Sequence, residues 1–425
     1  AARDRLACGT SYHGPAYARA FDGAGGAWDF RAVTEPSDFA TLKVRAEALV
    51  LALRARGRAC EELRRIPDET IAELHASGLF RMLQPRRFGG SELPFRALVE
   101  LGAIVARGCG STGWVLTNLA SHHWMLGMWP AAAQDEVWGG SPDALIGSAF
   151  VFPCGRARAV EGGYVLSGRW PFSSGIDASA WNLVGGVVRD GRDRPVEQRV
   201  FLVAAADYRV IDSWFVTGLR GTGSKDVEIS EVFVPAHRTL PPGAIAGGAT
   251  PGSAVNPGPL YKLPALGLFS FVVAAVSLGI AQGAIADYRT QMQSRIGAYT
   301  ARRLADLAGV QLRLAEASAL ADIAEALMLK GCDEATRITE SGAAPDAADK
   351  ARWRRDGAYA ASMCTKAVEL IFTAMGGAAV YLDAPVQRAF RDIVAANAHY
   401  ALSWDVNGTL WGRVALGLPP DAPAL

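Results

Sequence analysis

The chain has 425 residues, half of them hydrophobic, which is enough for two or three domains with ordinary hydrophobic cores. Its 43 Lys and Arg balance 42 Asp and Glu, so we expect no basic surface for nucleic acid or an anionic membrane. The six cysteines are scattered and form no close cluster with histidine. This pattern predicts reduced thiols in a cytoplasmic protein and no metal site, and the length and hydrophobic content exclude a small disulfide-stapled module. No apolar stretch follows Arg3 and Arg5, so we expect no signal peptide.

The first third of the chain predicts helices. Residues 1–36 are treated as an N-terminal arm without an assigned function, and residues 37–143 as an N-terminal helical domain. Apolar residues recur every three to four positions from Phe39 onward, which is typical of an amphipathic helix. A second helix is expected after Pro67, because proline suits the first turn of a helix. Two more helices are expected at 95–107 and 111–129.

The pattern changes near residue 144. Short β-branched runs separated by Gly and Asp-Gly turns predict an antiparallel β domain over residues 144–240. A Pro/Gly/Ala-rich linker covers 241–259, and residues 260–425 are expected to form a bundle of four long helices. The predicted fold class is therefore α+β. The four bundle helices are expected at 265–295, 301–330, 345–375 and 384–416.

One segment has the length of a membrane span. No charged residue occurs from Leu263 to Ala286, and a bilayer is crossed by about 20 apolar residues. The segment contains serines, a glutamine and three glycines and stands alone deep in the chain. We therefore expect a buried helix of the bundle and no contact with a membrane.

The sequence does not fit several familiar catalytic and binding motifs. The run from Gly218 to Lys225 is rich in glycine, but a strand follows it where a phosphate-binding loop needs a helix. A tight turn between strands is the simpler interpretation. His122 and His123 are neighbours, so on a helix their side chains diverge by about 100° and cannot ligate one metal ion. Serine hydrolase, zinc enzyme and nucleotide kinase chemistry therefore lose support.

The remaining polar candidates lie in an apolar frame. His122 is surrounded in sequence by aromatic and thioether side chains that would suit a flat apolar ligand, among them Trp124, Met125 and Met128. On sequence spacing alone, a buried structural histidine beside a packing stripe is the favoured explanation of this pattern, and the same ambiguity holds for His399. Ser173 and Ser174 fit an ordinary turn. The residue types alone leave these alternatives open.

The order of helices, β domain and helical bundle resembles the acyl-CoA dehydrogenase superfamily over residues 37 to about 415. In those dehydrogenases a glutamate abstracts the substrate proton, in many of them about eight residues beyond the Arg-Asp pair. Here Ala395–Tyr400 contains no carboxylate, which disfavours that chemistry. The matching segments are 84–90, 168–175, 218–227, 232–235, 376–377 and 384–392.

The residues that depart from the dehydrogenase pattern resemble those of another group with this fold. They are similar to the oxygenase components of two-component flavin monooxygenases of the 4-hydroxyphenylacetate 3-hydroxylase and steroid A-ring phenol hydroxylase type. The signature Gly110–Trp114, the segment Trp170–Gly175 and His399 point to that family. The resemblance implies that a separate NAD(P)H-dependent reductase delivers diffusible reduced FMN or FAD. The flavin then reacts with O₂ to a C4a-hydroperoxide that hydroxylates a small aromatic substrate, either phenolic or polycyclic.

The resemblance also implies catalytic roles. Ser173 would face flavin N5, with Ser174 as the alternative one residue on, and His399 would lie near C4a. His122 and Ser148 match positions that contact the phenolic oxygen of the substrate, and a neutral imidazole is able to take that proton. The side chains expected to line the substrate pocket are Trp124, Met125 and Met128.

Further residues are implied for cofactor binding and assembly. Trp170 and Ser173, with Ser174, would surround the flavin ring. Arg295 matches a phosphate-binding arginine that reaches the flavin of a neighbouring subunit, in a homo-oligomer expected to be a tetramer. Packing or solvated-face roles remain open for the others at that shared site, which are Gln311, Gly376 and Gly377.

Three other functions remain as alternatives. An N- or S-oxygenase of the same fold, such as an amino-sugar N-hydroxylase or a thiophene S-oxidase, would not need a base for a phenol, and the pair His122 and Ser148 argues against it. An acyl-CoA dehydrogenase lacks its glutamate. A scaffold without activity would have no reason to keep Ser173 and His399 together.

Overall fold

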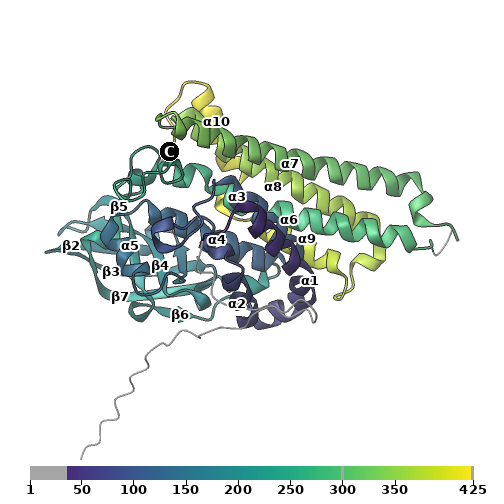
Figure 1. The fold of residues 1–425 in the computed structure, drawn as a ribbon, viewed down its shortest axis with the longest axis horizontal. Helices are drawn as coiled ribbons and strands as arrows, with labels where there is room; N and C mark the ends of the chain where they lie inside the picture. Colours follow the sequence, from purple (N-terminus) through teal and green to yellow (C-terminus); the bar gives the residue numbers. More distant parts are fainter. Residues whose placement is uncertain (1–35, 298–300, 423–425) are drawn as a thin grey trace, which may run out of the picture.

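The computed structural model describes residues 36–297 and 301–422, so the predicted arm, apart from its last residue, lies outside the described residues. The predicted α+β class and the predicted order of helices, β domain and helical bundle are confirmed. A sheet stands at one end, a long helical bundle extends from the other, and the N-terminal helices lie between them (Figure 1). One hydrophobic core joins the two helical parts, and a smaller core fills the β domain.

The N-terminal helices follow the predicted pattern closely. Asp38 caps the first helix by accepting a 2.8 Å bond from the backbone N–H of Thr41. The second helix starts directly after Pro67, and Gly78 adopts φ +78° just beyond its end. The sequence did not predict the short helix α5. The helices are α1 (Phe39–Leu63), α2 (Asp68–Ala76), α3 (Arg96–Gly108), α4 (Gly110–Gly127) and α5 (Ala131–Trp138).

Within the described residues, eight strands form one sheet in the order β6-β7-β3-β2-β4-β5-β8, with β1 also paired to β4. The sheet is mixed, although an antiparallel domain was expected, because β1 and β2 both run parallel to β4. Other segments of the chain lie between each of these strands and β4, so neither forms a hairpin with it. The hairpin signals in the sequence did not reveal this parallel pairing. The strands are β1 (Ile146–Ala149), β2 (Gly155–Val160), β3 (Gly163–Ser173), β4 (Trp181–Arg189), β5 (Pro195–Ala204), β6 (Arg209–Ile211), β7 (Lys225–Pro235) and β8 (Thr239–Leu240).

The expected linker, residues 241–259, is packed against the protein. The backbone N–H of Gly252 donates to the carbonyl of Met128, and the Asn256 amide donates to the carbonyl of Gly127. Pro242 and Ile245 are buried in a 3₁₀ turn. The proline and glycine content therefore marks a closely fitted connection between the sheet and the bundle.

The C-terminal helices are α6 (Ala265–Ser294), α7 (Ala308–Glu340), α8 (Ala347–Met375), α9 (Pro385–Asn397) and α10 (Trp404–Ala415). The fourth predicted helix, 384–416, is broken into α9 and α10. At the break, His399 Nδ1 accepts from the backbone N–H of Ala401 and Ser403 caps α10. The Asn407 side chain donates to carbonyls of this bend, among them that of Ala401. These local bonds replace helical ones, and an alanine-rich pattern does not reveal them.

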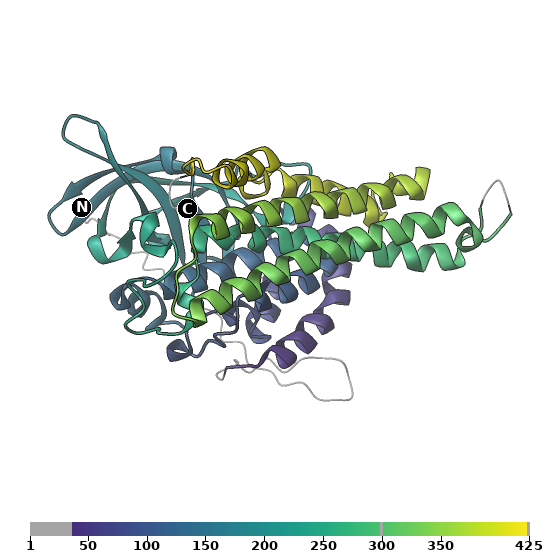
Figure 2. The same cartoon turned by 90° about the horizontal axis from the view of Figure 1, so that it is seen from above.

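Helix α6 is the uncharged segment that was expected to be buried. Its length and composition would suffice to cross a membrane, but 83% of its most apolar window is buried inside the protein. The helix lies in the centre of the molecule, packed by α3 and α4 on one side and by α7 and α8 on the other (Figure 2). It is a core helix, as predicted.

Candidate active site

Helix α4 carries His122 to the boundary between the helical core and the sheet. The ring is 1% exposed, and its Nδ1 lies 2.6 Å from the carbonyl oxygen of Ile146 in β1. Because a carbonyl only accepts, Nδ1 holds the proton of the neutral ring and Nε2 carries a free lone pair. Nε2 is buried and has no partner among the described residues. Burial lowers the pKa of His122 to about 4, so the ring is neutral at pH 7.

The neighbouring His123 points elsewhere, as the helical geometry predicted. Its Nε2 lies 3.2 Å from the carbonyl of Ala144, and its ring contacts Trp138 edge to face. Burial lowers the pKa of His123 to about 3. No group of three or more potential ligands gathers around either ring, or elsewhere in residues 36–297 and 301–422.

The burial of His123 predicts a pH dependence of stability. Between about pH 6.5 and 3 the unfolded chain binds a proton at this residue that the folded protein does not, so stability falls as the pH is lowered through this window. From pH 7.5 to 5 the loss is about 2 kcal/mol. His123→Gln keeps a donor for Ala144 without a titrating group, and its thermal unfolding midpoint should drop less between pH 7.5 and 5 than that of the parent. Equal drops would contradict the assignment.

Ser173 is placed by an irregularity at the end of β3. The pairing of β3 with β7 shifts register between Trp170 and Ser173, and Phe172 adopts φ +70°. Such a bulge re-aims side chains, so Phe172 is 62% exposed whereas Ser173 is fully buried. The Ser173 hydroxyl lies 3.0 Å from Asn182 Oδ1 and 3.4 Å from the carbonyl of Ser148. Its proton is thus directed into the protein, and its lone pairs are left to accept.

Asn182 was missed by the sequence reasoning. It is fully buried in β4, and its Nδ2 has no partner among the described residues. It stands opposite Gly147 of β1, next to Ser148. One signal was present in the sequence, since Asn182 is the single polar side chain in the otherwise apolar run from Trp181 to Val188.

Ser174 belongs to a second hydroxyl cluster. Its Oγ accepts a 3.0 Å bond from Trp114 Nε1 and lies 2.7 Å from Ser224 Oγ, which in turn lies 2.7 Å from Thr222 Oγ1. The hydroxyl is therefore engaged by the glycine-rich loop and by α4. This placement favours Ser173 over Ser174 as the residue that faces a ligand.

His399 joins the site from the bend after α9. Its ring lies 5.6 Å from that of Trp114, edge to face, and 6.0 Å from that of Phe269. Since Nδ1 accepts from the N–H of Ala401, the neutral ring carries its proton on Nε2. Burial lowers the pKa of His399 to about 4. His399 is thus a neutral N–H donor at pH 7, whereas His122 is a neutral acceptor.

The four predicted catalytic residues are therefore connected through short chains of contacts. His122 bonds to β1 at Ile146, and Ser148 of the same strand accepts from Ser173 through its carbonyl. Trp114 then links the segment after Ser173 to His399.

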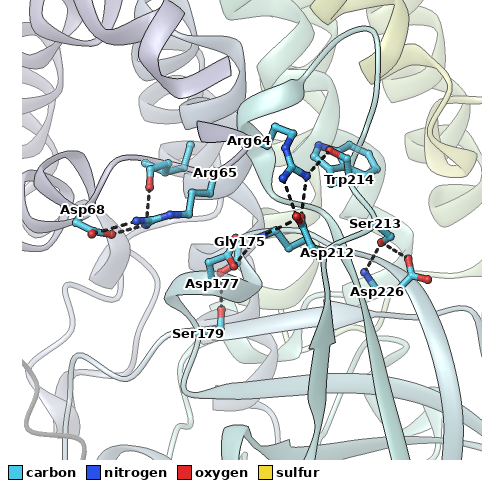
Figure 3. A network of polar contacts seen from close by, with 12 residues as sticks. Arg64, Arg65, Asp68, Gly175, Asp177, Ser179, Asp212, Ser213, Trp214 and Asp226 are labelled. Atoms are coloured by element: carbon cyan, nitrogen blue, oxygen red, sulfur yellow. Dashed lines mark hydrogen bonds and ion pairs between the residues drawn. The ribbon is translucent and has the colours of Figure 1, made fainter. Parts of the chain in front are cut away.

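A network of ion pairs holds the loops beside this cluster (Figure 3). Arg64 at the end of α1 binds Asp212 through two bonds of 2.7 and 2.6 Å. Lys225, at the start of β7, lies 2.7 Å from Asp177, which follows the Ser173 segment. The network fixes α1, the start of β7 and the turn after Ser173 relative to one another.

The glycine-rich run from Gly218 is structural, as the tight-turn interpretation predicted. A Cβ on Gly218 would lie 1.9 Å from the carbonyl oxygen of Arg391, so only glycine allows this close approach of the loop to α9. The backbone N–H of Leu219 donates a 2.7 Å bond to Asp392, and Arg391 Nη1 donates to the carbonyl of Thr217. Two of the motifs that carried the resemblance therefore meet in space.

An apolar cavity lies beside His122, with about 20 Å³ of space. Met125 is the one predicted pocket residue that lines it. Trp124 instead packs on Phe95 and donates to the carbonyl of Leu260, and Met128 is buried outside the cavity lining. Trp124 is adjacent to Met125 and therefore points about 100° away from it around α4, and Met128 lies just beyond the last residue of that helix. The lining residues are Met125, Trp129, Phe150, Phe152, Leu183, Val200, Pro242, Ile245 and Leu266.

Comparisons with known proteins identify the family of the chain. Residues 271–404 match the family model described as acyl-CoA dehydrogenase, C-terminal domain. The oxygenase component of the FADH(2)-dependent resorcinol hydroxylase of Rhizobium sp. is 37% identical over 377 residues, covering 86% of this chain and 92% of the relative. The chain belongs to the family of flavin-dependent monooxygenase oxygenase components.

Solved structures of this family superimpose closely on the chain. The 3-HSA hydroxylase of Rhodococcus sp. RHA1 matches with a TM-score of 0.87 and 33% identity, over 91% of this chain and all of that one. XiaF from Streptomyces sp., solved with FADH2 and glycerol, matches with a TM-score of 0.85 and 28% identity, over 91% of this chain and 98% of that one. Reduced flavin is accordingly the cofactor of this oxygenase component, which works with a separate flavin reductase.

The residues present fit a flavin beside the sheet. Asn182 Nδ2 and His122 Nε2 are buried polar atoms without partners in the described residues, and unpaired buried polar groups are costly unless a ligand or water completes them. Ser173 has an acceptor lone pair to spare. Among residues 393–402 of this oxygenase component there is no Asp or Glu, so a dehydrogenase base is missing from the His399 bend.

Trp170 does not share this arrangement. It is fully buried in the core of the β domain, and its indole N–H donates to the carbonyl of Gly185 at 2.6 Å. Packing within the sheet accounts for its side chain. Its predicted contact with the flavin ring gains no support from this placement.

The other predicted cofactor residues lie at the far end of the bundle. The end of α6, the start of α7 and the end of α8 meet there, away from the sheet (Figure 2). Arg295 ends α6, Gln311 donates to the carbonyl of Ala305, and a Cβ on Gly376 or Gly377 would meet nothing within 4 Å. One chain does not bring these residues to Ser173, so their role in flavin binding stays a prediction about a second subunit.

Proposed function

We propose that this protein hydroxylates a phenolic aromatic substrate, using reduced FMN or FAD that diffuses from its reductase. Reduced flavin, when bound, reduces O₂ and passes one oxygen atom to the substrate. The observation that carries the proposal is the buried, unpartnered Nε2 of His122, whose tautomer is fixed by Ile146. A phenol hydroxyl donates to this atom, and transfer of its proton makes the ring electron-rich at the moment of attack.

The other residues have matching tasks. Ser173, with its proton directed toward Asn182, accepts from the N5–H of the flavin. His399 donates its Nε2 proton toward oxygen, and Ser148 stands beside the phenol. The apolar side chains near His122 exclude water, which would otherwise divert the oxygen to hydrogen peroxide. Arg295, Gln311, Gly376 and Gly377 hold the flavin of a neighbouring subunit in a homotetramer.

The proposal includes a cytoplasmic setting. The five described cysteines are free, as expected for reduced thiols, and the near-zero net charge suits a small uncharged substrate. An N- or S-oxygenase would have no use for a base directed at a phenol.

The experiment is a single-turnover assay with the flavin-free protein. Reduced FMN or reduced FAD is mixed with the protein and a phenol, and oxygen is admitted. We expect hydroxylated product in an amount close to the flavin oxidised, with little hydrogen peroxide. The proposed function is wrong if one hydrogen peroxide forms for each flavin oxidised with every phenol, or if butyryl-CoA reduces bound flavin.

A further inference from the structure

The cavity beside His122 is built from the immediate neighbours of the proposed phenol-binding residues. Met125 lies three residues beyond His122 on α4, and Leu183 is the cross-strand partner of Ser148. Phe150 follows Ser148 by two residues, and its ring stands 6.3 Å from that of His122, edge to face. The cavity therefore adjoins the polar end of the proposed substrate site.

The chemistry of its wall is uniformly apolar. None of the nine lining side chains carries a charge, and the single nitrogen among them, Trp129 Nε1, is a buried donor without a partner in the described residues. A carboxylate that enters such a site loses its water and meets no cation, and one N–H does not offset that loss. The wall selects against a negative charge.

The volume of the cavity limits the size of the group that it can hold. About 20 Å³ holds roughly one water-sized group, so a methyl group or the terminal methyl of an ethyl group fits, and a larger one requires movement. Met125 has the flexible side chain that allows limited adjustment. Apolar cavities of this kind stay dry, so filling this one with carbon is favourable.

We propose that the substrate is an uncharged phenol with a small apolar substituent, and that this substituent enters the cavity between Met125, Leu183 and Val200. The inference rests on the proposed function for the phenol end of the site. It adds a substrate class, alkyl- or similarly substituted neutral phenols, and it excludes phenols that carry a carboxylate at the same position.

The first test measures binding to the flavin-free protein by calorimetry. The probes are phenol, 4-ethylphenol and 4-hydroxyphenylacetate, which places a carboxylate where the ethyl group ends. Each buried methylene tightens binding about fourfold, so 4-ethylphenol should bind about tenfold more tightly than phenol. The carboxylate compound should bind at least tenfold more weakly than 4-ethylphenol. Equal or tighter binding of 4-hydroxyphenylacetate would overturn the inference.

Variants of β5 locate the binding site. Val200→Phe fills the cavity and should remove the preference for 4-ethylphenol over phenol, whereas Val200→Ala enlarges it and should shift the preference toward 4-propylphenol. Val196→Phe is the matched control, because Val196 lies on the same strand and is 65% exposed. An unchanged ratio of 4-ethylphenol to phenol binding in both Val200 variants would contradict the assignment of the cavity.

Turnover separates this inference from the proposed function. If the binding order holds and no phenol is hydroxylated with reduced flavin and O₂, the proposed function fails while the substrate site stands. If phenols are hydroxylated and the carboxylate compound is the best of them, the proposed function stands and the substrate class is wrong.

Discussion

Ser173→Ala is expected to convert the enzyme into a producer of hydrogen peroxide. The hydroxyl of Ser173 has its proton directed to Asn182 at 3.0 Å and to the carbonyl of Ser148, so it serves the flavin as an acceptor. Loss of a buried hydrogen bond costs about 1 to 3 kcal/mol, which corresponds to at least about a fivefold faster release of hydrogen peroxide from the enzyme. The measurement is peroxide released per flavin oxidised, at saturating phenol.

Two further variants sharpen this prediction. Asn182→Ala should shift the yield in the same direction by a smaller factor, because Ser173 stays in place and only its orientation is released. Ser174→Ala is the matched control, since its hydroxyl is engaged by Trp114 and Ser224. A larger effect at Ser174 than at Ser173 would show that the roles of the two serines are reversed.

His122→Ala is expected to abolish hydroxylation while flavin oxidation continues. Removal of a positioned general base costs about 10²- to 10⁴-fold, and His122 Nε2 is the acceptor assigned to the phenol proton. The rate of product formation should fall by that factor, and peroxide should replace the missing product. Flavin reoxidation in the absence of substrate should stay within a few-fold of the parent.

The pH dependence of the same reaction adds a second readout. Because the pKa of His122 lies at about 4, protonation of this ring should not reduce product formation between pH 8 and 5.5.

The control for the His122→Ala variant is His123→Gln, which replaces the neighbouring histidine and should keep product yield near that of the parent. Loss of hydroxylation in His123→Gln at unchanged thermal stability, with none in His122→Ala, would refute the assignment of the base.

The helices and the polar residues of the site could be predicted from sequence for different reasons. Periodicity and the signals at Pro67 and Gly78 determine where α2 lies, because these effects act within a few residues. His122, Ser148, Ser173 and His399 were predicted through the resemblance, since nothing in their spacing brings them together. The structure connects them through Ile146 and Trp114.

The misses share one physical origin, which is contact between residues distant in sequence. Asn182 matters because β4 pairs with β1 and places it beside Ser173, and no local pattern encodes that pairing. Trp124 and Met128 were expected in the pocket from composition, but Met125 alone of the three lines the cavity. The break after α9 depends on the side chains of His399 and Asn407 bonding to backbone groups.

The proposed function and substrate class both require that this chain transfers one atom of O₂ to a neutral phenol. The most direct measurement is a single turnover with reduced flavin, 4-ethylphenol and ¹⁸O₂, followed by mass spectrometry of the product. We expect a catechol that carries one ¹⁸O atom, formed by the parent and lost in His122→Ala. A product oxygen derived from water, or no hydroxylated product with any neutral phenol, would contradict it.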